Sequence, residues 1–315
     1  MNMKKIKLAL NIAAIFAVCL FCSSVAQAQA CRTWVSALGN DADPCSRTAP
    51  CKTFSGAISK TAEGGEIDAL DPGGYGTLTI GKSLTVDGGT GSGWASVLAS
   101  GANGFIVNVT TNPTTAVVIL RHISLNGTRN GTVCADGLNG IRYLAGSKLI
   151  VDDCQIFGFS QKAIDVNLLA TGSLAVYNTY IEDCFDGIVM TNNGGTMKGV
   201  VTNSKITMTN NSALNLLSGS ATISNSVVSN NASFGVISQG GAAINVTNTV
   251  LSHNGTALST AAAASSLRIS NNDILNNTTG LSNTGTTTST QNNRFFGNTA
   301  DLAGGAIVNC PTCVK

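Results

Sequence analysis

Short segments in which apolar and polar residues alternate recur along most of the chain. In each copy, an apolar residue stands at every second position of the first half, and an Asp or Asn usually follows. A period of two is typical of β-strands, whose successive side chains point to opposite faces. The copies are Val118–Leu125, Leu149–Ile156, Leu174–Ile181, Gly199–Ile206, Ala221–Val228, Ile244–Leu251 and Leu267–Ile274, with a degenerate copy that ends at Phe296.

The spacing of the copies predicts how these strands are arranged. From Asp153 onward the copies follow one another at intervals of 22 to 25 residues, and a second short apolar segment keeps a similar period. Two or three short strands with tight turns fill a repeat of this length. Such a coil cannot bury its own apolar face, so neighbouring coils must stack on one another. The chain is therefore expected to be all-β, a single-stranded parallel β-helix or solenoid.

An asparagine recurs where the first strand of each coil ends. Asn tolerates the left-handed region of backbone space, which suits a sharp bend. Its amide can also bond to the same residue one coil away, at a distance of about 4.8 Å. We expect a structural column of amides inside the stack rather than a functional site. Its members are Asn178, Asn203, Asn225, Asn248 and Asn271; Asp153 and His122 take the slot in earlier coils.

The second histidine has an equally structural interpretation. His253 fills a turn slot where other coils place Asn230, Asn276 and Asn298. Neither histidine supports a Ser-His-Asp or a Cys-His catalytic arrangement.

The N-terminal third carries segments that resemble a known family. Thr53–Ile58 reads as a short amphipathic cap helix, Gly64–Ile67 starts the first coil, Leu70–Ile80 continues it, and Ser83–Gly88 forms another rung. With the repeat, these segments resemble the pectate lyase/polygalacturonase superfamily. The resemblance implies a right-handed β-helix.

A narrower resemblance rests on the residues before this helix. Arg32-Thr-Trp-Val-Ser36, with Cys45 and Cys51-Lys-Thr-Phe54, is similar to a group of exported bacterial β-helix proteins that mostly lack an assigned function. The expected organisation is a signal peptide at 1–30 and an N-terminal cap with a disulfide loop and helix at 31–63. The β-helix follows at 64–300, and a tail with a Cys-x-x-Cys motif at 301–315.

The first thirty residues have the layout of a secretory signal peptide. Lys4, Lys5 and Lys7 precede the uncharged apolar run Leu8–Phe21, and cleavage is expected after Ala28 or Ala30. The run is too short to remain as a membrane-spanning helix, and no later stretch is long and apolar enough. We therefore expect a secreted, periplasmic or cell-surface protein without a transmembrane segment.

Eight cysteines remain after this cleavage, which suggests disulfides in an exported chain. Cys45 and Cys51 close a short loop and are expected to pair. Cys310 and Cys313 could pair, bind a metal or do redox work, and a lone Cys-x-x-Cys is a weak metal signal. The other four allow three pairings: Cys31, Cys134, Cys154 and Cys184. Cleavage after Ala30 would make Cys31 a candidate for lipidation, but the Leu expected three positions before it is missing.

Charge is scarce, and this excludes one class of partner. Only 11% of the residues are charged and the net charge is +2. No basic patch suited to phosphates is present, so nucleic acid is not an expected partner. We expect a monomer.

The charged residues that do occur gather on the coils from 122 to 190 and suggest a carbohydrate site. Two carboxylates could act as acid and base in glycosidic cleavage, or could hold Ca²⁺. The candidate catalytic residues are Asp152, Asp183 and Asp186, and the candidate substrate-binding residues are Arg121, Tyr177, Glu182 and Lys162. The insertion Asn126–Asn139 could wall this patch. The alternative interpretation is a pair of rung salt bridges, Arg121–Asp152 and Lys162–Asp186, on a solvated face.

The family's catalytic motifs are only partly present. Hydrolases of the superfamily use several Asp in Asn-Thr-Asp, Asp-Asp, Gly-His-Gly and Arg-Ile-Lys motifs. This chain has Asp152-Asp153 but neither of the last two motifs, and the lyases' calcium and base residues find no residue-by-residue match. Aromatic residues make up only 5%, and charge is nearly absent from outward positions after Thr191. We expect a secreted protein that binds and could cleave a polysaccharide; the alternative is a non-enzymatic, adhesin-like surface protein.

Overall fold

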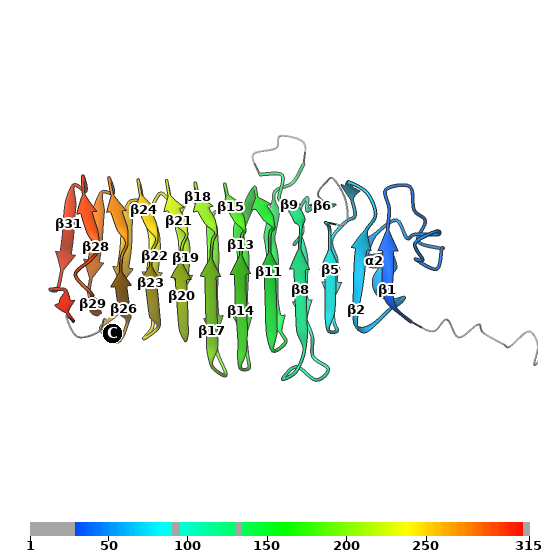
Figure 1. The fold of residues 1–315 in the computed structure, drawn as a ribbon, viewed down its shortest axis with the longest axis horizontal. Coiled ribbons are helices and arrows are strands. Elements are labelled where there is room, and N and C mark those ends of the chain that lie inside the picture. Colours follow the sequence, from blue (N-terminus) through cyan, green and yellow to red (C-terminus); the bar gives the residue numbers. More distant parts are fainter. Residues whose placement is uncertain (1–28, 90–94, 130–133, 311–315) are drawn as a thin grey trace, which may run out of the picture.

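The computed structural model describes residues 29–89, 95–129 and 134–310. Figure 1 shows an elongated stack of coils, with the N-terminal cap at one end and β31 near the other. Three parallel sheets run the length of the stack. In these ranges the structure has no helix that is long and apolar enough to cross a membrane. The predicted parallel β-helix is confirmed.

The chain visits the three sheets in turn, and each sheet gains one strand per coil. We number the sheets in the order in which the chain meets them. Sheet 1 is formed by β1 (Ala30–Val35), β2 (Thr61–Ala69), β5 (Leu84–Asp87), β8 (Val117–Arg121), β11 (Lys148–Asp152), β14 (Gly172–Tyr177), β17 (Met197–Thr202), β20 (Ser220–Ser224), β23 (Ala243–Thr247), β26 (Ser266–Ser270), β29 (Thr286–Ser289) and β32 (Val308–Asn309).

Sheet 2 has the shortest strands. It comprises β3 (Gly73–Gly74), β6 (Ala95–Leu98), β9 (Ile123–Asn126), β12 (Gln155–Phe157), β15 (Tyr180–Glu182), β18 (Lys205–Thr207), β21 (Val227–Ser229), β24 (Val250–Ser252), β27 (Asp273–Leu275) and β30 (Arg294–Phe296).

Sheet 3 closes each coil. It comprises β4 (Leu78–Ile80), β7 (Phe105–Asn108), β10 (Gly137–Ala145), β13 (Phe159–Leu168), β16 (Asp186–Asn192), β19 (Ser212–Leu216), β22 (Phe234–Ser238), β25 (Thr256–Thr260), β28 (Thr279–Asn283) and β31 (Ala300–Gly304). Each sequence repeat thus spans one strand of sheet 1 and one of sheet 2, and its second apolar segment lies in sheet 3.

The apolar alternation of each strand fills the interior of the stack. Leu149 and Val151 of β11 are fully buried and pair in register with Leu174 and Val176 of β14. Ile150 and Ala175, which lie between these pairs, point to the opposite face and are partly exposed. Because every coil contributes the same slots, apolar side chains form continuous internal columns, and burial depends on the neighbouring coil.

The recurring asparagines at the corner between sheets 1 and 2 turn the chain as predicted, but their side chains do not lie inside. Asn178, Asn203, Asn225, Asn248 and Asn271 have φ between 49° and 53°. All five are exposed, so the predicted internal amide column is wrong at these positions. A left-handed residue at the corner directs its own side chain outward and the next one inward. Outward amide contacts still occur, as between Asn271 Nδ2 and Asn248 Oδ1 (2.7 Å).

The internal polar ladder of this corner is built by the residue that follows each asparagine. The backbone N–H of Thr179 donates to Ser204 Oγ (3.2 Å), and that of Thr249 donates to Asn272 Oδ1 (3.0 Å). Buried backbone amides need such acceptors, because no water reaches them. The ladder therefore satisfies the buried backbone N–H groups of the corner, while the inward side chains of the strands on either side stay apolar.

A second ladder runs along the corner between sheets 2 and 3. Asn230, His253 and Asn276 are left-handed there, which confirms the structural slot predicted for His253. The next residue in each coil is a buried asparagine, and the chain of amides includes Asn254 Nδ2 to Asn277 Oδ1 (3.0 Å). Asn298 belongs to this buried ladder rather than to the left-handed slot, since it accepts from Asn277 Nδ2 (2.9 Å).

The N-terminal cap matches its sequence signals. The helix α2 (Phe54–Ile58) begins after Thr53, whose side chain accepts from the backbone N–H of Gly56, and Phe54 and Ala57 are buried. Cys45 and Cys51 form the predicted disulfide. The predicted signal peptide covers residues 1–30. Residues 1–28 lie outside the described ranges, so only its last two positions are described.

Four of the other cysteines do not follow the predicted pairings. Cys31 and Cys134 are exposed free thiols, and Cys154 and Cys184 are buried free thiols, so none of the three pairings considered above is formed. Cys154 and Cys184 instead fill slots of the two corner ladders. Cys310 is disulfide-bonded. Cys313 lies outside the described residues, so the Cys310–Cys313 pair stays a prediction.

Candidate functional site

Three of the predicted site residues form a column on the outer face of sheet 1. Arg121 in β8, Asp152 in β11 and Tyr177 in β14 are paired in register on consecutive coils. Each is partly exposed. Outer positions at the same place in successive coils must lie above one another, which is why the sequence repeat alone could place them together.

The other four predicted residues lie on different faces. Glu182 ends β15 in sheet 2, Asp183 occupies the next corner, and Asp186 and Lys162 belong to sheet 3. The chain turns at two corners between Tyr177 and Asp186, so residues nine positions apart point in different directions. The structure does not bring these carboxylates to the column on sheet 1.

Each of these four side chains has a local partner. Asp186 is buried and accepts from the backbone N–H (3.0 Å) and the hydroxyl (2.5 Å) of Ser212. Lys162 Nζ lies 2.7 Å from Asp165 Oδ1. Glu182 accepts from the Tyr180 hydroxyl (2.5 Å).

The insertion contributes the partner of Asp183. Arg129 NH1 lies 3.7 Å from Asp183 Oδ1. The described ends of the insertion Asn126–Asn139 join β9 of sheet 2 to β10 of sheet 3, so they lie at that corner and not beside the Arg121–Asp152 patch.

The rung salt bridges considered above form with other partners. Arg121 Nε binds Asp87 Oδ2 at 2.7 Å, and Arg121 NH2 lies 3.4 Å from Glu66 Oε1. Arg121 therefore turns toward the N-terminal coils rather than toward Asp152, which accepts from Asn178 Nδ2 (2.9 Å).

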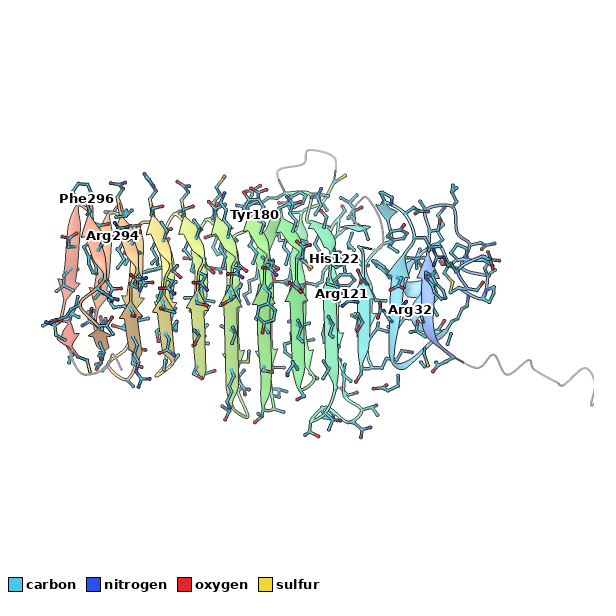
Figure 2. All side chains as sticks on the ribbon, viewed as in Figure 1. Arg32, Arg121, His122, Tyr180, Arg294 and Phe296 are labelled. Carbon is cyan, nitrogen blue, oxygen red and sulfur yellow. A yellow bond between two sulfur atoms is a disulfide. The ribbon has the colours of Figure 1, made fainter. Side chains whose placement is uncertain are left out.

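The column on sheet 1 continues through these N-terminal coils. Asp87 in β5 is the register partner of Arg121, Asp68 in β2 is the partner of Asp87, and Trp34 in β1 is the partner of Asp68. From Trp34 to Tyr177 the column thus reads aromatic, acid, acid, base, acid, aromatic. Figure 2 labels Arg32, Arg121 and His122 along this part of the stack.

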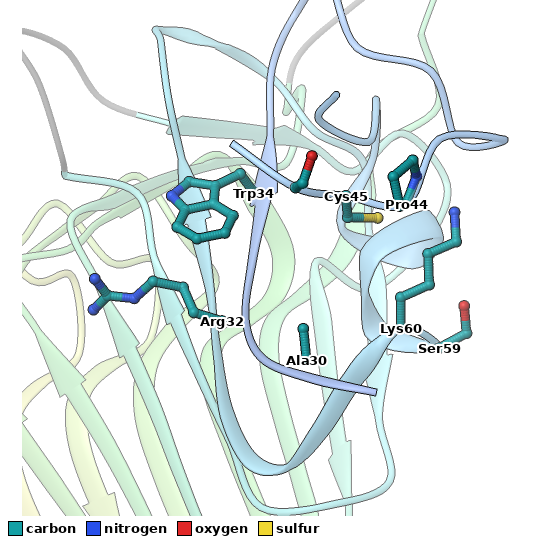
Figure 3. Close-up of a pocket in the computed structure, with 8 residues that line it drawn as sticks. Ala30, Arg32, Trp34, Pro44, Cys45, Ser59 and Lys60 are labelled. Atoms are coloured by element: carbon teal, nitrogen blue, oxygen red, sulfur yellow. The ribbon is translucent and has the colours of Figure 1, made fainter. Parts of the chain in front are cut away.

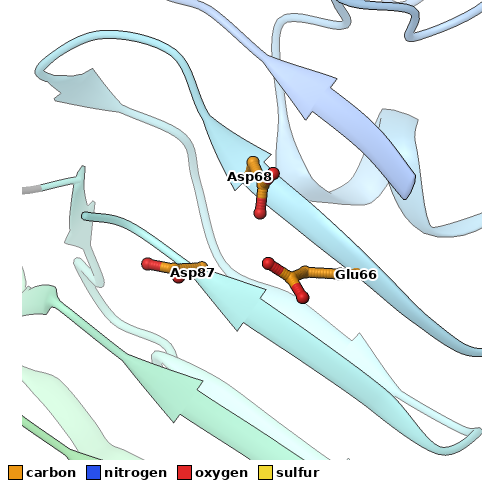
Figure 4. A group of neighbouring side chains, drawn as sticks. All are labelled: Glu66, Asp68 and Asp87. Carbon is orange, nitrogen blue, oxygen red and sulfur yellow. The ribbon is translucent and has the colours of Figure 1, made fainter. Parts of the chain in front are cut away.

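Two of the column's acids, Asp68 and Asp87, gather with a third carboxylate outside the column into one cluster. Glu66 lies two residues before Asp68 on β2, and this spacing puts both side chains on the outer face. Glu66, Asp68 and Asp87 each offer one carboxylate oxygen, and these oxygens lie within 4.8 Å of one another (Figure 4). We call these three residues the acidic triad. Arg32 contacts two of its members, Glu66 at 3.1 Å and Asp68 at 3.2 Å.

Burial differs sharply within the triad. The side chain of Asp68 is 2% exposed, against 9% for Asp87 and 21% for Glu66. Asp68 Oδ1 is buried and has no hydrogen-bond partner. An orphaned carboxylate oxygen is expensive in a protein interior, so this atom calls for a proton or a cation.

The electrostatics of the triad separate its two column members. Burial, followed by the neighbouring Glu66 carboxylate, raises the pKa of Asp68 to about 7. Burial would also raise the pKa of Asp87, but hydrogen bonds from His122, Gly89 and Arg121 outweigh it and lower that pKa. One carboxyl therefore holds a proton near neutral pH while its neighbour is ionised.

Sequence reasoning missed the triad although the signal was present. Leu84-Thr-Val86-Asp87 has the same alternation as Leu149-Ile-Val151-Asp152, so extending the repeat one coil further back would have placed Asp87 beneath Arg121. The insertion between the two coils hides this, because Asp87 and Arg121 are separated by 34 residues instead of 22 to 25.

A hollow lies at the N-terminal end of the column. It is lined by Arg32 and Trp34 of β1, by Pro44 and Cys45 of the disulfide loop, and by Lys60 after the helix (Figure 3). Arg32 thus takes part in both the hollow and the triad. The chemistry gathered here consists of oxygen ligands suited to a hard cation, guanidinium groups suited to an anion, and an aromatic ring.

Comparisons with known proteins agree with this architecture. The family model for the right-handed β-helix region matches residues 195–310. No match was found among curated proteins. Among solved structures, the chain is similar to the crystal structure of pectate lyase Pel9A, with a TM-score of 0.57 and 14% identity over 88% of this chain and 79% of that one. It is also similar to a rhamnogalacturonan lyase, with a TM-score of 0.51 and 15% identity over 82% and 75%. At these identities the likeness concerns the fold alone: the chain folds as a right-handed parallel β-helix.

Proposed function

We propose that this protein binds an acidic polysaccharide along the outer face of sheet 1. The observation that carries the proposal is the unbroken column from Trp34 to Tyr177, which has an aromatic ring at each end and charged groups between them. Consecutive strands lie about 4.8 Å apart, so five steps span roughly 24 Å. A flat face of that length suits an extended oligosaccharide.

The chemistry of the column favours an acidic glycan. Aromatic rings offer apolar faces for sugar rings, and carboxylates accept from hydroxyls. Arg32 and Arg121 have side chains 55% and 36% exposed, and a guanidinium group binds a carboxylate in a bidentate fashion. The fold adds support, since pectate lyase Pel9A and the rhamnogalacturonan lyase share it.

Tyr177→Ala is expected to weaken binding of polygalacturonate or another acidic polysaccharide by about tenfold, equivalent to ~1.4 kcal/mol. The matched control is Tyr180→Ala, because Tyr180 lies on the same coil but on sheet 2, where its hydroxyl binds Glu182. Affinity electrophoresis or calorimetry with acidic and neutral glycans provides the measurement. Equal losses in the two variants would place the glycan elsewhere.

Cleavage would be measured in the same samples, through the ultraviolet absorbance of unsaturated lyase products and through new reducing ends. Products that vanish in Asp152→Ala would make the protein an enzyme with its site on this column. Binding without products would leave a lectin-like role.

A structural surface role is the second candidate, and the C-terminal coils favour it. There the outer column continues as hydroxyl residues in register, Thr202, Ser224, Thr247 and Ser270, without charge or aromatic rings. Thr202 and Ser224 are hydrogen-bonded to each other across the coils. Failure to bind any acidic or neutral glycan would refute the glycan proposal and favour this role.

A further inference from the structure

We infer that the acidic triad Glu66, Asp68 and Asp87 is a binding site for one divalent cation, with Ca²⁺ as the best fit. The inference is independent of the proposed glycan binding, because it concerns the protein without any polysaccharide. It rests on the geometry of the carboxylates, on the orphaned oxygen of Asp68 and on the exposure of Arg32, one of the two arginines that contact the cluster.

The geometry suits Ca²⁺. Calcium takes oxygen ligands at 2.3–2.6 Å, so two oxygens that share one ion lie at most about 5 Å apart. The three carboxylate oxygens lie within 4.8 Å of one another, and they are held by adjacent strands of one sheet. Mg²⁺ demands shorter bonds and near-ideal octahedral geometry, which a row of outward side chains on a sheet is less able to supply.

The orphaned oxygen is the observation that separates this cluster from an ordinary group of surface acids. Asp68 Oδ1 is buried and unpartnered, on a side chain that is 2% exposed. Figure 4 shows the three side chains as neighbours on the adjacent strands β2 and β5. A cation placed between them would satisfy Asp68 Oδ1 and would shield the carboxylates from one another.

Arg32 is the group that the cation would displace. Its side chain is 55% exposed, and it reaches Glu66 and Asp68 from the edge strand β1. About half of the Arg32 side chain already lies in solvent, so its guanidinium group can move away once the cation replaces it as the partner of the buried Asp68. Arg121 can keep its shorter contact, 2.7 Å to Asp87 Oδ2, while the cation replaces its longer one, 3.4 Å to Glu66 Oε1.

Tb³⁺ luminescence tests the site directly. Tb³⁺ replaces Ca²⁺ at oxygen sites and emits when a nearby tryptophan is excited, and Trp34 is the register partner of Asp68. We expect sensitised emission that Ca²⁺ competes away, with one ion per chain. Trp34→Phe should remove the emission but leave Ca²⁺ binding in calorimetry unchanged. Absence of Ca²⁺ binding in calorimetry would overturn the inference.

Two variants with opposite expected effects make the test specific. Asp68→Asn should weaken Ca²⁺ binding at least tenfold, whereas Arg32→Ala should strengthen it, because the competing guanidinium group is gone. The control is Asp273→Asn, since Asp273 is also paired with an arginine, Arg294, but lies far along the stack in β27. If Asp68→Asn fails to fold, Glu66→Gln replaces it. Unchanged affinity in Asp68→Asn, or weaker binding in Arg32→Ala, would contradict the site.

Discussion

Asn254→Ala is expected to lower the free energy of unfolding by about 3–5 kcal/mol. Asn254 is 2% exposed and lies in the middle of the amide ladder between sheets 2 and 3. Its Oδ1 accepts from the backbone N–H (3.2 Å) and from Nδ2 (2.8 Å) of Asn231, and its Nδ2 donates to Val228 O (3.1 Å). Alanine leaves the backbone N–H and the Nδ2 of Asn231 buried without these partners, at about 1–3 kcal/mol each. It also removes the bonds from Asn254 Nδ2 to Val228 O and to Asn277 Oδ1.

Denaturant unfolding of Asn254→Ala and of the native sequence, measured under the same conditions, checks the size of this loss in stability. Asn245→Ala is the matched control, because Asn245 is exposed on the outer face of β23 and donates one long bond to Thr222 Oγ1 (3.3 Å). The control should change stability by no more than about 0.5 kcal/mol. Similar effects of the two substitutions would mean that the ladder adds nothing beyond the loss of one amide.

The fold was predictable because it is repeated. Leu149, Val151 and their counterparts recur often enough for the period of two within a strand and the period of 22 to 25 residues between coils to be measured within one chain. Stacking follows from that repetition, since no coil can bury its own apolar face. The capping signal Thr53 and the short loop from Cys45 to Cys51 are local in sequence, and both predictions are confirmed.

The direction of side chains at the corners could not be obtained in the same way. The left-handed backbone at Asn178 and its counterparts was correctly predicted from residue type. Whether such a residue faces inward depends on the path of the chain on both sides of the bend, and alternation breaks off there. Thr179 and Ser204, which do line the interior, resemble ordinary loop residues in the sequence.

The candidate site was only partly predictable for a related reason. Register within the regular coils placed Arg121, Asp152 and Tyr177 together. The first coils are separated by irregular loops, so the contact of Arg121 with Asp87 depends on three-dimensional register that the spacing does not reveal. Asp183 and Asp186 were grouped with the column because they are near Tyr177 in sequence. However, Asp183 itself lies at the second corner after Tyr177, and Asp186 lies beyond that corner in sheet 3.

Asp68→Asn is expected to stabilise the cation-free protein, relative to the native sequence, more strongly at pH 8 than at pH 5. The pKa of Asp68 is about 7 in the folded protein, because of burial and the neighbouring Glu66 and Asp87, with Arg32 opposing them. In the unfolded chain that pKa is about 3.9. Between these values the folded state holds a proton that the unfolded state lacks, so stability is lost as pH rises through the window.

The charged groups that face Asp68 come from four strands, and they set the size of the effect. Glu66 of β2 and Asp87 of β5 disfavour its ionisation, while Arg32 of β1 and Arg121 of β8 favour it. The neutral amide cannot ionise, so the difference in unfolding free energy between the two proteins should grow with pH by on the order of 2–4 kcal/mol.

Denaturant unfolding of both proteins in the presence of a chelator, at pH 5 and at pH 8, provides the measurement. Asp273→Asn should show no such rise, because Arg294 lowers the pKa of Asp273. Parallel pH profiles for Asp68→Asn and the native sequence would show that Asp68 stays ionised in the folded protein.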